Sequence, residues 1–401
     1  MNGSLKRFTE RFIEGLLALS GTITTLTVLL IIIFLFNEGL GVFNTSPLEN
    51  NNTVLANSKN PVGQLKPEQI KNIFDANITN WKELGGNNDS IVLLTINTIS
   101  DFLSEEDIGA NFEFLPAKLD SLISNNSGML AVFPEKYLLP NHQSKIVKVD
   151  KNNLPDFLTG KLWFPTAEPA VQLGALPLIL GTLLVSIFAI LFALPVGLAT
   201  AVYMAEVANP KVRNIMKPVI ELLSGIPSVV YGFFGLITIV PMIHDWFNLP
   251  VGETALAGSI VLGIMALPTI ITVSEDAIRN TPRAMKEASL ALGATRWQTI
   301  SRVVLPYSMS GITAAAILGI GRAIGETMAV LMVTGNAAVM PHSLLQPVRT
   351  IPATIAAELG EAPQGGVHFK ALFALGCILF IMTMAINLWV QYISNKRKFA
   401  K

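Results

Sequence analysis

Six long apolar segments constrain the fold of this chain more than any other feature of its sequence. An α-helix needs about 20 mainly apolar residues to cross a bilayer. The chain has 401 residues, of which only 14% are charged, whereas soluble proteins average about 25%. We therefore predict an all-α polytopic membrane protein with six transmembrane helices, at residues 12–36, 174–204, 216–243, 254–275, 307–335 and 370–394.

The residues between the first and second apolar segments have a different composition. Residues 45–166 are rich in Asn, Asp, Lys and Pro, and they hold no apolar run long enough to cross a membrane. Helix-like sequence at 66–74 is mixed with strand-like sequence at 90–96 and 145–149. We predict an inserted, water-exposed α/β domain here, so that the chain divides into residues 1–44, 45–166 and 167–401.

Lysine and arginine are distributed unevenly among the short loops. The loop at 276–306 carries five of them, and the loop at 244–253 carries none. Cytoplasmic loops of membrane proteins carry the excess of these residues. This asymmetry, together with the basic residues near both chain ends, predicts that both termini and the 276–306 loop are cytoplasmic. The 45–166 domain is then expected in the periplasm, outside the lipid of a bacterial inner (plasma) membrane.

The charged loop at 279–306 has an amphipathic pattern that is interrupted at Gly293. Glycine at this point permits a bend between two short helices. An apolar helix face can seat in the groove of a soluble partner, and the chain has no P-loop pattern for binding ATP itself. Glu287, Ala288 and Gly293 form the spacing E-A-x-x-x-x-G, which closes at Leu305 and Pro306. This spacing resembles the EAA loop of ABC-importer permeases, and the resemblance implies that the loop couples the membrane helices to a separate ATPase. An ordinary charged loop is the alternative.

Two ionisable residues, Arg322 and Glu326, interrupt the fifth apolar segment. An ionisable group at membrane depth costs about 2.5–3.5 kcal/mol or more, so it is by default a functional candidate. The spacing of four residues would put both side chains on one helix face, where they can pair. The planar guanidinium also suits a tetrahedral oxyanion, which it binds through two parallel hydrogen bonds. We predict a substrate path at Arg322, Glu326 and Thr327; a permanent ion pair that only fixes packing is the alternative.

A second candidate part of the path is the segment ELLSGIPSVVYGFFGL at 221–236. Gly225 and Pro227 should break or bend the helix within the membrane, where irregular backbone needs cover from protein or a cavity. Ser224 and Ser228 flank this break and could line a polar path. The simpler interpretation is an ordinary proline kink.

These segments carry a family resemblance. GIGRAIGETMAVLMVTGN at 319–336, the 221–236 segment and the E-A-x-x-x-x-G loop together resemble the phosphate ABC-transporter permeases of the PstC type, over residues 174–395. The resemblance implies a type I ABC importer permease fold and a transporter subunit rather than an enzyme. It also implies four partners: a PstA-like second permease subunit in a heterodimer, a dimer of PstB-like ATPases, a PstS-like phosphate-binding protein, and phosphate.

Two alternatives stay open beside phosphate import. The substrate could be another tetrahedral oxyanion, such as sulfate or molybdate. The protein could instead be a membrane sensor of phosphate status, although its short cytoplasmic segments favour the transporter. A formal net charge of zero, a single cysteine (Cys377) and four scattered histidines give no indication of nucleic-acid binding, a cofactor or a metal site.

The inserted domain resembles part of a periplasmic phosphate-binding protein. The resemblance lies in LKPEQIKNIFDANITNWKELGG at 65–86 and SNNSGMLAVFPEKYL at 124–138. The Ser-Gly-Thr anion loop of that family is missing between these segments. Residues 45–166 also contain no arginine, which is the usual bidentate ligand of phosphate. We therefore expect the domain to dock a separate binding protein or to act as a spacer, rather than to capture the anion.

Overall fold

The computed structural model describes residues 3–48, 52–109 and 112–399. Six helical stretches in this part of the chain are long and apolar enough to cross a membrane. The prediction of six transmembrane helices is therefore confirmed, as is the mainly helical fold class with an inserted α/β domain. The six stretches are Arg11–Asn44, Leu176–Val207, Ser228–Phe247, Ala255–Arg279, Arg296–Ile324 and Val367–Tyr392.

The chain folds into two compact units, which we call the sheet unit and the helical unit. The sheet unit is built from the described residues of Met1–Leu158, Phe164–Gly174 and Pro363–Ala374. The helical unit is built from those of Thr159–Trp163, Ala175–Ala362 and Leu375–Lys401. The sheet unit thus includes chain segments that follow residue 166, the limit predicted for the inserted domain.

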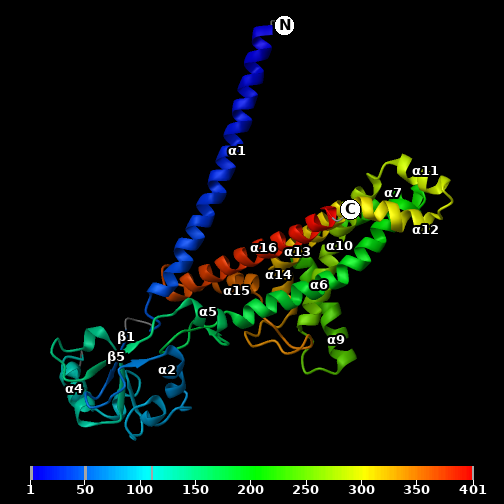
Figure 1. Ribbon diagram of the computed structural model, residues 1–401. Helices are drawn as coiled ribbons and strands as arrows, with labels where there is room; N and C mark the ends of the chain where they lie inside the picture. The colour runs from blue at the N-terminus through cyan, green and yellow to red at the C-terminus, as the bar shows by residue number, and fades with distance from the viewer. Residues whose placement is uncertain (1–2, 49–51, 110–111, 400–401) are drawn as a thin grey trace. The chain divides into compact units, whose positions relative to one another are not determined.

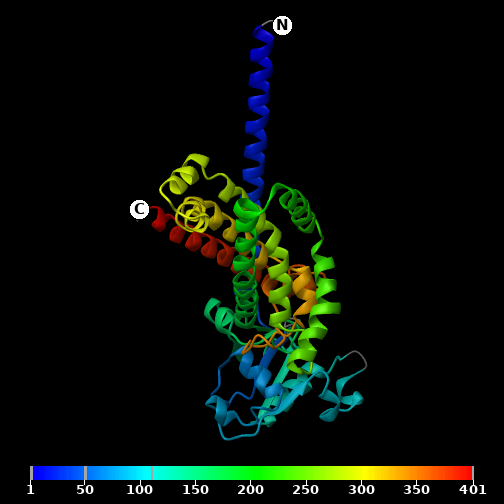
Figure 2. The same cartoon turned by 90° about the vertical axis from the view of Figure 1, so that its right-hand side faces the viewer.

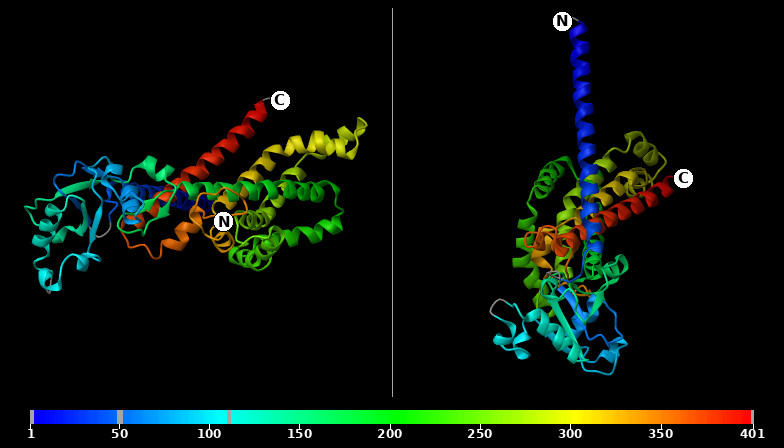
Figure 3. Two further views of the ribbon diagram at one scale, coloured as in Figure 1. Left: turned by 90° about the horizontal axis from the view of Figure 1, so that it is seen from below. Right: turned by 90° about the vertical axis from the view of Figure 1, so that its left-hand side faces the viewer.

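The sheet unit is built around a mixed five-stranded sheet (Figure 3). The strand order is β2-β5-β1-β4-β3; β1 is antiparallel to both of its neighbours, whereas the β2–β5 and β3–β4 pairs are parallel. The strands are β1 (Asn52–Ala56), β2 (Gln64–Leu65), β3 (Val92–Thr95), β4 (Met129–Pro134) and β5 (Lys145–Val149). The strand predicted at 145–149 coincides with β5, and the one predicted at 90–96 contains β3.

Helices cover both faces of this sheet. Side chains of α2 (Pro67–Phe74) lie in the hydrophobic cluster on one face, and side chains of α4 (Leu115–Asn125) lie in the cluster on the other. Successive residues of a strand point to opposite faces, and in β1 Val54 joins the first cluster while Leu55 joins the second. The other elements of this region are α1 (Gly3–Leu40), α3 (Glu105–Ile108), α5 (Leu154–Thr159), and the pair β6 (Trp163–Phe164) and β7 (Gln172–Leu173).

The segment that resembles phosphate-binding proteins forms α2 and a following 3-10 turn at Trp81–Leu84. Trp81 is fully buried, and its indole N–H donates to the carbonyl oxygen of Gly128 at 3.0 Å. The side-chain oxygen of Asn80 accepts a hydrogen bond from the backbone N–H of Lys82 at 2.9 Å, which caps the turn. The Asn-Trp pair of the motif therefore acts in folding the domain.

In the helical unit, α6 (Leu176–Val202), α10 (Ala255–Arg279) and α13 (Leu305–Ile324) pack side by side (Figure 1). Small residues let these helices approach closely: a Cβ atom on Gly197 of α6 would come 2.8 Å from Ile270 of α10. The other helices of this unit are α7 (Pro210–Ser224), α8 (Ser228–Phe234), α9 (Val240–Phe247), α11 (Arg283–Ala291), α12 (Arg296–Thr299), α14 (Met328–Val333) and α15 (Ile351–Glu358). The helix α16 (Val367–Phe399) starts in the sheet unit and belongs to the helical unit from Leu375 on.

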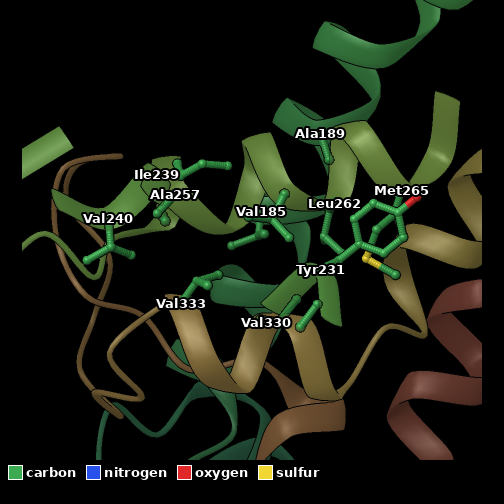
Figure 4. Close-up of a cluster of buried hydrophobic side chains, with 14 of the residues drawn as sticks. Val185, Ala189, Tyr231, Ile239, Val240, Ala257, Leu262, Met265, Val330 and Val333 are labelled. Atoms are coloured by element: carbon green, nitrogen blue, oxygen red, sulfur yellow. The ribbon is translucent and has the colours of Figure 1, made fainter. Parts of the chain in front are cut away.

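A large buried cluster of the helical unit joins residues of six helices, namely α6, α8, α9, α10, α13 and α14 (Figure 4). Val185 of α6, Tyr231 of α8, Leu262 of α10 and Val330 of α14 all belong to it. Three short π-helical segments continue the long helices: Tyr203–Val207 after α6, Gly235–Ile239 between α8 and α9, and Ile300–Val304 between α12 and α13. The cluster fixes the broken helices around α10.

The third transmembrane segment differs from its prediction. The predicted span began at residue 216, but α7 ends at Ser224 and the apolar stretch begins at Ser228. Pro227 has φ −59° and ψ 144°, which is an extended conformation that cannot continue a helix. The break predicted at Gly225–Pro227 is therefore confirmed, and it separates α7 from the membrane-crossing part.

Candidate functional site

The 279–306 loop forms two short helices with a bend between them, as predicted. α11 ends at Ala291, Gly293 has φ +84°, and α12 begins at Arg296. A positive φ of this kind favours glycine, which has no Cβ atom. Thr295 and Gln298 start α12 with a capping box: the Thr295 hydroxyl accepts from the Gln298 N–H at 3.2 Å, and the Gln298 side chain accepts from the Thr295 N–H at 2.9 Å.

The loop lies at one end of the helical unit (Figure 2). It carries exposed apolar side chains. Within α11 no residue is buried, and Glu287 and Ala288 are exposed. Leu292 is 90% exposed and Trp297 is 67% exposed. Large apolar side chains on such a loop are suited to a protein partner that covers them.

Leu305 and Pro306 stand at the start of α13, directly after the π-helical segment Ile300–Val304. Proline is favoured in the first turn of a helix because its missing N–H has no partner there. Leu305 packs against a cluster that includes Ile278 of α10. The loop thus passes into a transmembrane helix without an intervening linker.

Sequence reasoning missed the ion pair that attaches α11 to the membrane helices. Lys286 Nζ lies 2.5 Å from Glu206 Oε1, and Glu206 belongs to the π-helical end of α6. Inside the loop, the Ser289 and Thr299 hydroxyls lie 3.0 Å apart. The two residues of the ion pair are 80 positions apart in the chain, so no local pattern could have revealed it.

A second ion-pair network ties α7 to the loop-proximal end of α10. Glu275 is 1% exposed, and its oxygens lie 2.9 Å from Arg213 Nε and 3.1 Å from Lys217 Nζ. Burial opposes the charge on Lys217, but contacts with Glu275 and Asp276 outweigh it and raise the Lys217 pKa. This network ties α7, which is not among the six apolar stretches, to α10.

The fifth transmembrane stretch ends between two residues of the predicted path. α13 ends at Ile324, Gly325 follows, and α14 begins at Met328. The prediction of one continuous span over 307–335, with Arg322 and Glu326 paired on one face, is therefore wrong. Helical i, i+4 geometry is lost at the break, and no ion pair joins the two side chains in the described part of the chain.

Arg322 and Glu326 bind different partners instead. An Nη1 donor of Arg322 contacts the hydroxyl of Thr269 on α10 at 3.4 Å. Glu326 Oε1 accepts the backbone N–H of Ala329 at 3.4 Å, at the N-terminus of α14. Both hydrogen bonds are long. Within the described residues, the half-buried guanidinium of Arg322 therefore keeps most of its donors available.

Thr327 lies in the break and lines a cavity of about 500 Å³. Its other walls are mainly apolar: Pro352 comes from α15, Leu359 directly follows α15, and Leu379 comes from α16. Arg322 and Glu326 are not among the lining residues. The structure thus places Thr327 beside the cavity but does not gather all the predicted path residues around it.

Ser224 and Ser228 stand on either side of the break between α7 and α8. The Ser224 hydroxyl donates to the carbonyl oxygen of Glu221 at 2.7 Å. The Tyr231 hydroxyl reaches back across the break and donates to the carbonyl oxygen of Leu223 at 2.8 Å. These bonds satisfy carbonyl groups that the helix end leaves unpaired, and no described contact joins either serine to Arg322.

Comparisons with known proteins agree with this architecture. The family model described as "Binding-protein-dependent transport system inner membrane component" matches residues 193–399. The chain is 42% identical over 244 residues to the "Probable ABC transporter permease protein YqgH" of Bacillus subtilis, which covers 61% of this chain and 78% of the relative. It is 38% identical over 255 residues to the "Phosphate transport system permease protein PstC" of Mesorhizobium japonicum, which covers 59% and 77%.

A solved structure of the MetNI methionine ABC transporter in an inward-facing conformation is also similar. It is 21% identical, covers 56% of this chain and 94% of that chain, and has a TM-score of 0.42. The match to the family model covers more than half of the chain. The chain therefore belongs to the inner membrane components of binding-protein-dependent transport systems, and it is a multi-pass membrane subunit of a transporter.

Proposed function

We propose that this chain is the permease subunit of an ATP-driven importer for inorganic phosphate. The observation that carries the proposal is its 38% identity, over 255 residues, to a relative named as the phosphate transport permease PstC. The exposed bent loop at 279–306 and the available guanidinium of Arg322 add physical support. Substrate would cross by alternating access, in which the helices open to one side of the membrane at a time.

The energy for this cycle comes from partner subunits. The loop offers Leu292 and Trp297 as exposed anchors for an ATPase. Glu287 and Ala288 belong to α11 and Gly293 to the bend after it, and this part of the loop would contact the ATPase. A PstB-like ATPase dimer hydrolyses ATP, a PstA-like subunit completes the membrane pore, and a PstS-like protein delivers phosphate. This chain carries out no covalent step.

Arg322 is the anion-binding residue in this proposal. An arginine that is already locked to a carboxylate has few donors left for a substrate, but Arg322 has one long hydrogen bond to a neutral hydroxyl of Thr269. A guanidinium with available donors can hold two phosphate oxygens at once. Glu326, held at the α14 N-terminus, lies four residues away and favours release by repelling the anion.

The inserted domain faces the periplasm in this arrangement, with both chain ends and the 279–306 loop in the cytoplasm. Its cavity of about 710 Å³ is lined by Glu168 and by uncharged residues such as Asn97 and Thr98, and the described lining includes no lysine or arginine. A carboxylate without a cation disfavours an anionic ligand. The domain therefore serves as a docking surface or spacer for the binding protein.

The direct test is uptake of labelled phosphate by cells that express this chain with its partner subunits. The proposal expects ATP-dependent uptake that excess unlabelled phosphate abolishes. Competition by sulfate or molybdate instead would assign the path to another oxyanion. Phosphate-dependent signalling without any uptake would favour a sensor.

A further inference from the structure

The coupling loop is attached to α6 as well as to α13. Its covalent continuation is α13, whereas Lys286 of α11 is bound to Glu206 at the end of α6, with Nζ and Oε1 2.5 Å apart. The two side chains are 21% and 13% exposed. A pair that is this well shielded from water is screened less than a surface pair and holds its partners more firmly.

Glu206 stands on a distinctive piece of backbone. The last turn of α6 changes to a π-helix at Tyr203–Val207. Such turns are rare and occur frequently at functional sites. Because α11 has no buried residue of its own, this ion pair is a principal tie between α11 and a transmembrane helix within the described residues.

From Glu206, α6 runs through the helical unit beside α10, with Pro195 in its interior. It packs closely on α10: a Cβ atom at Gly197 of α6 would lie 2.8 Å from Ile270 of α10, and one at Gly263 of α10 would lie 2.8 Å from Phe192 of α6. Packed helices of this kind shift as bodies rather than deform, because close-packed interiors transmit displacement. A movement imposed at Glu206 therefore reaches the other end of the helix.

The other end of α6 holds the start of α15. The hydroxyl of Thr182 accepts the backbone N–H of Ile351 at 2.9 Å. Thr182 and Glu206 are 24 residues apart, which corresponds to about 36 Å along an α-helix. The α15 helix in turn lines the cavity beside Thr327. One helix thus connects the coupling loop to the wall of that cavity.

We propose that the Glu206–Lys286 ion pair positions the coupling helix against α6 and transmits the movement of α11 through α6 to α15. This inference rests on the proposed function, since it assumes that a partner ATPase moves the loop. It adds a second route to the covalent one through Leu305 and α13. Glu206 is a positioning residue and touches neither substrate nor ATP.

The test uses the complete complex, with both permease subunits, the ATPase and the binding protein, reconstituted in lipid vesicles. Phosphate imported and ATP hydrolysed are measured in the same vesicles. In Glu206→Gln the ion pair is lost while side-chain size is kept, so the phosphate imported per ATP should fall about fivefold or more, the size of a typical coupling energy. ATP hydrolysis should persist.

Two further variants make the result specific. Exchange of the charges, with Glu206→Lys and Lys286→Glu together, should restore most of the ratio because an ion pair can form again. Glu14→Gln removes an exposed carboxylate of α1 that has no ion pair among the described residues, and it should leave the ratio unchanged.

An unchanged ratio in an assembled Glu206→Gln complex would overturn the inference, and so would a charge-exchanged variant no better than Glu206→Gln. Neither result would affect the proposed function, because the unaltered complex would still import phosphate. A complex that never imports phosphate would instead contradict the proposed function itself.

Discussion

Gly181 of α6 lies against the backbone of Arg349: a Cβ atom at Gly181 would come 2.3 Å from the Arg349 carbonyl oxygen. Arg349 in turn donates through Nη1 to Glu358 Oε1 at 2.6 Å, and the indole N–H of Trp163 donates to the other oxygen of that carboxylate at 3.1 Å. The absence of a side chain at Gly181 therefore lets α6 support a polar network that fixes both ends of α15.

Replacing Gly181 with alanine should force this segment away from α6. Overpacking of a tight contact costs about 1–3 kcal/mol, which should exceed the gain in helix propensity of about 1 kcal/mol. We expect a lower thermal unfolding temperature of the purified chain and reduced phosphate uptake. Gly21→Ala is the control, because a Cβ atom there meets nothing within 4 Å. Equal destabilisation by both changes would contradict the steric explanation.

Arg322→Ala should abolish phosphate uptake without loss of the protein from the membrane. Each charge-assisted hydrogen bond is worth about 1.5–3 kcal/mol, so phosphate affinity should fall about tenfold or more. Arg322→Lys keeps the charge but loses the planar fork, and it should retain partial uptake. Thr269→Val removes the hydrogen-bond partner on α10 and should affect uptake less than Arg322→Ala. Normal uptake by the Arg322→Ala variant would contradict anion binding by Arg322 and would mean that this residue serves only in packing.

Gly293→Val should uncouple ATP hydrolysis from phosphate import. The φ angle of +84° at Gly293 is unfavourable for any residue with a Cβ atom, by about 1–2 kcal/mol, so the angle between α11 and α12 should change. Gly365→Val is a matched control, because Gly365 has φ +77° and equally open surroundings but lies outside the loop. The ratio of phosphate imported to ATP hydrolysed should fall only in Gly293→Val. A fall in both variants would mean that general strain is responsible.

Asp120 should stabilise the inserted domain in a pH-dependent manner. Burial opposes its ionisation, but backbone N–H donors of Gln143 and Ser144 outweigh burial and lower the Asp120 pKa below the usual 3.8. The Asp120 carboxylate therefore stabilises the folded domain fully above its usual pKa of 3.8, and this stabilisation is lost as the pH falls through the lowered pKa of the folded state. Asp120→Asn should lower the unfolding temperature of the domain at pH 6, by the equivalent of about 1 kcal/mol.

Calorimetry of the full-length chain between pH 6 and pH 3 would measure this effect. The difference between Asp120→Asn and the unaltered chain should shrink as the carboxylate becomes protonated. Asp101→Asn provides the control, because the exposed Asp101 carboxylate accepts no hydrogen bond in the described part of the chain. A difference that stays constant over this pH range would contradict the assignment.

Local sequence signals predicted the features that depend on local chemistry. The bend at Gly293 and the break at Gly225–Pro227 follow from backbone preferences of glycine and proline, and the structure has both. The limits of the third and fifth spans were wrong because apolar composition continues across the helix ends at Ser224 and Ile324. Hydropathy measures transfer into lipid and does not report where a helix stops.

Tertiary partners could not be predicted from the sequence. Arg322 was identified by its charge inside an apolar segment, but its neighbour Thr269 is 53 positions away. Glu206 and Lys286 look like ordinary charged residues of two separate loops until the fold places them 2.5 Å apart. The break after Ile324 also separates Glu326 from Arg322, and its position depends on how α13 and α14 pack against α10.

The most direct test of the central claim is labelled phosphate uptake into vesicles that contain the assembled complex, with ATP supplied on the ATPase side. The account predicts phosphate accumulation that requires both ATP and the binding protein, and that sulfate and molybdate do not inhibit. An assembled complex that hydrolyses ATP but accumulates no phosphate, or accumulates sulfate or molybdate in its place, would contradict it.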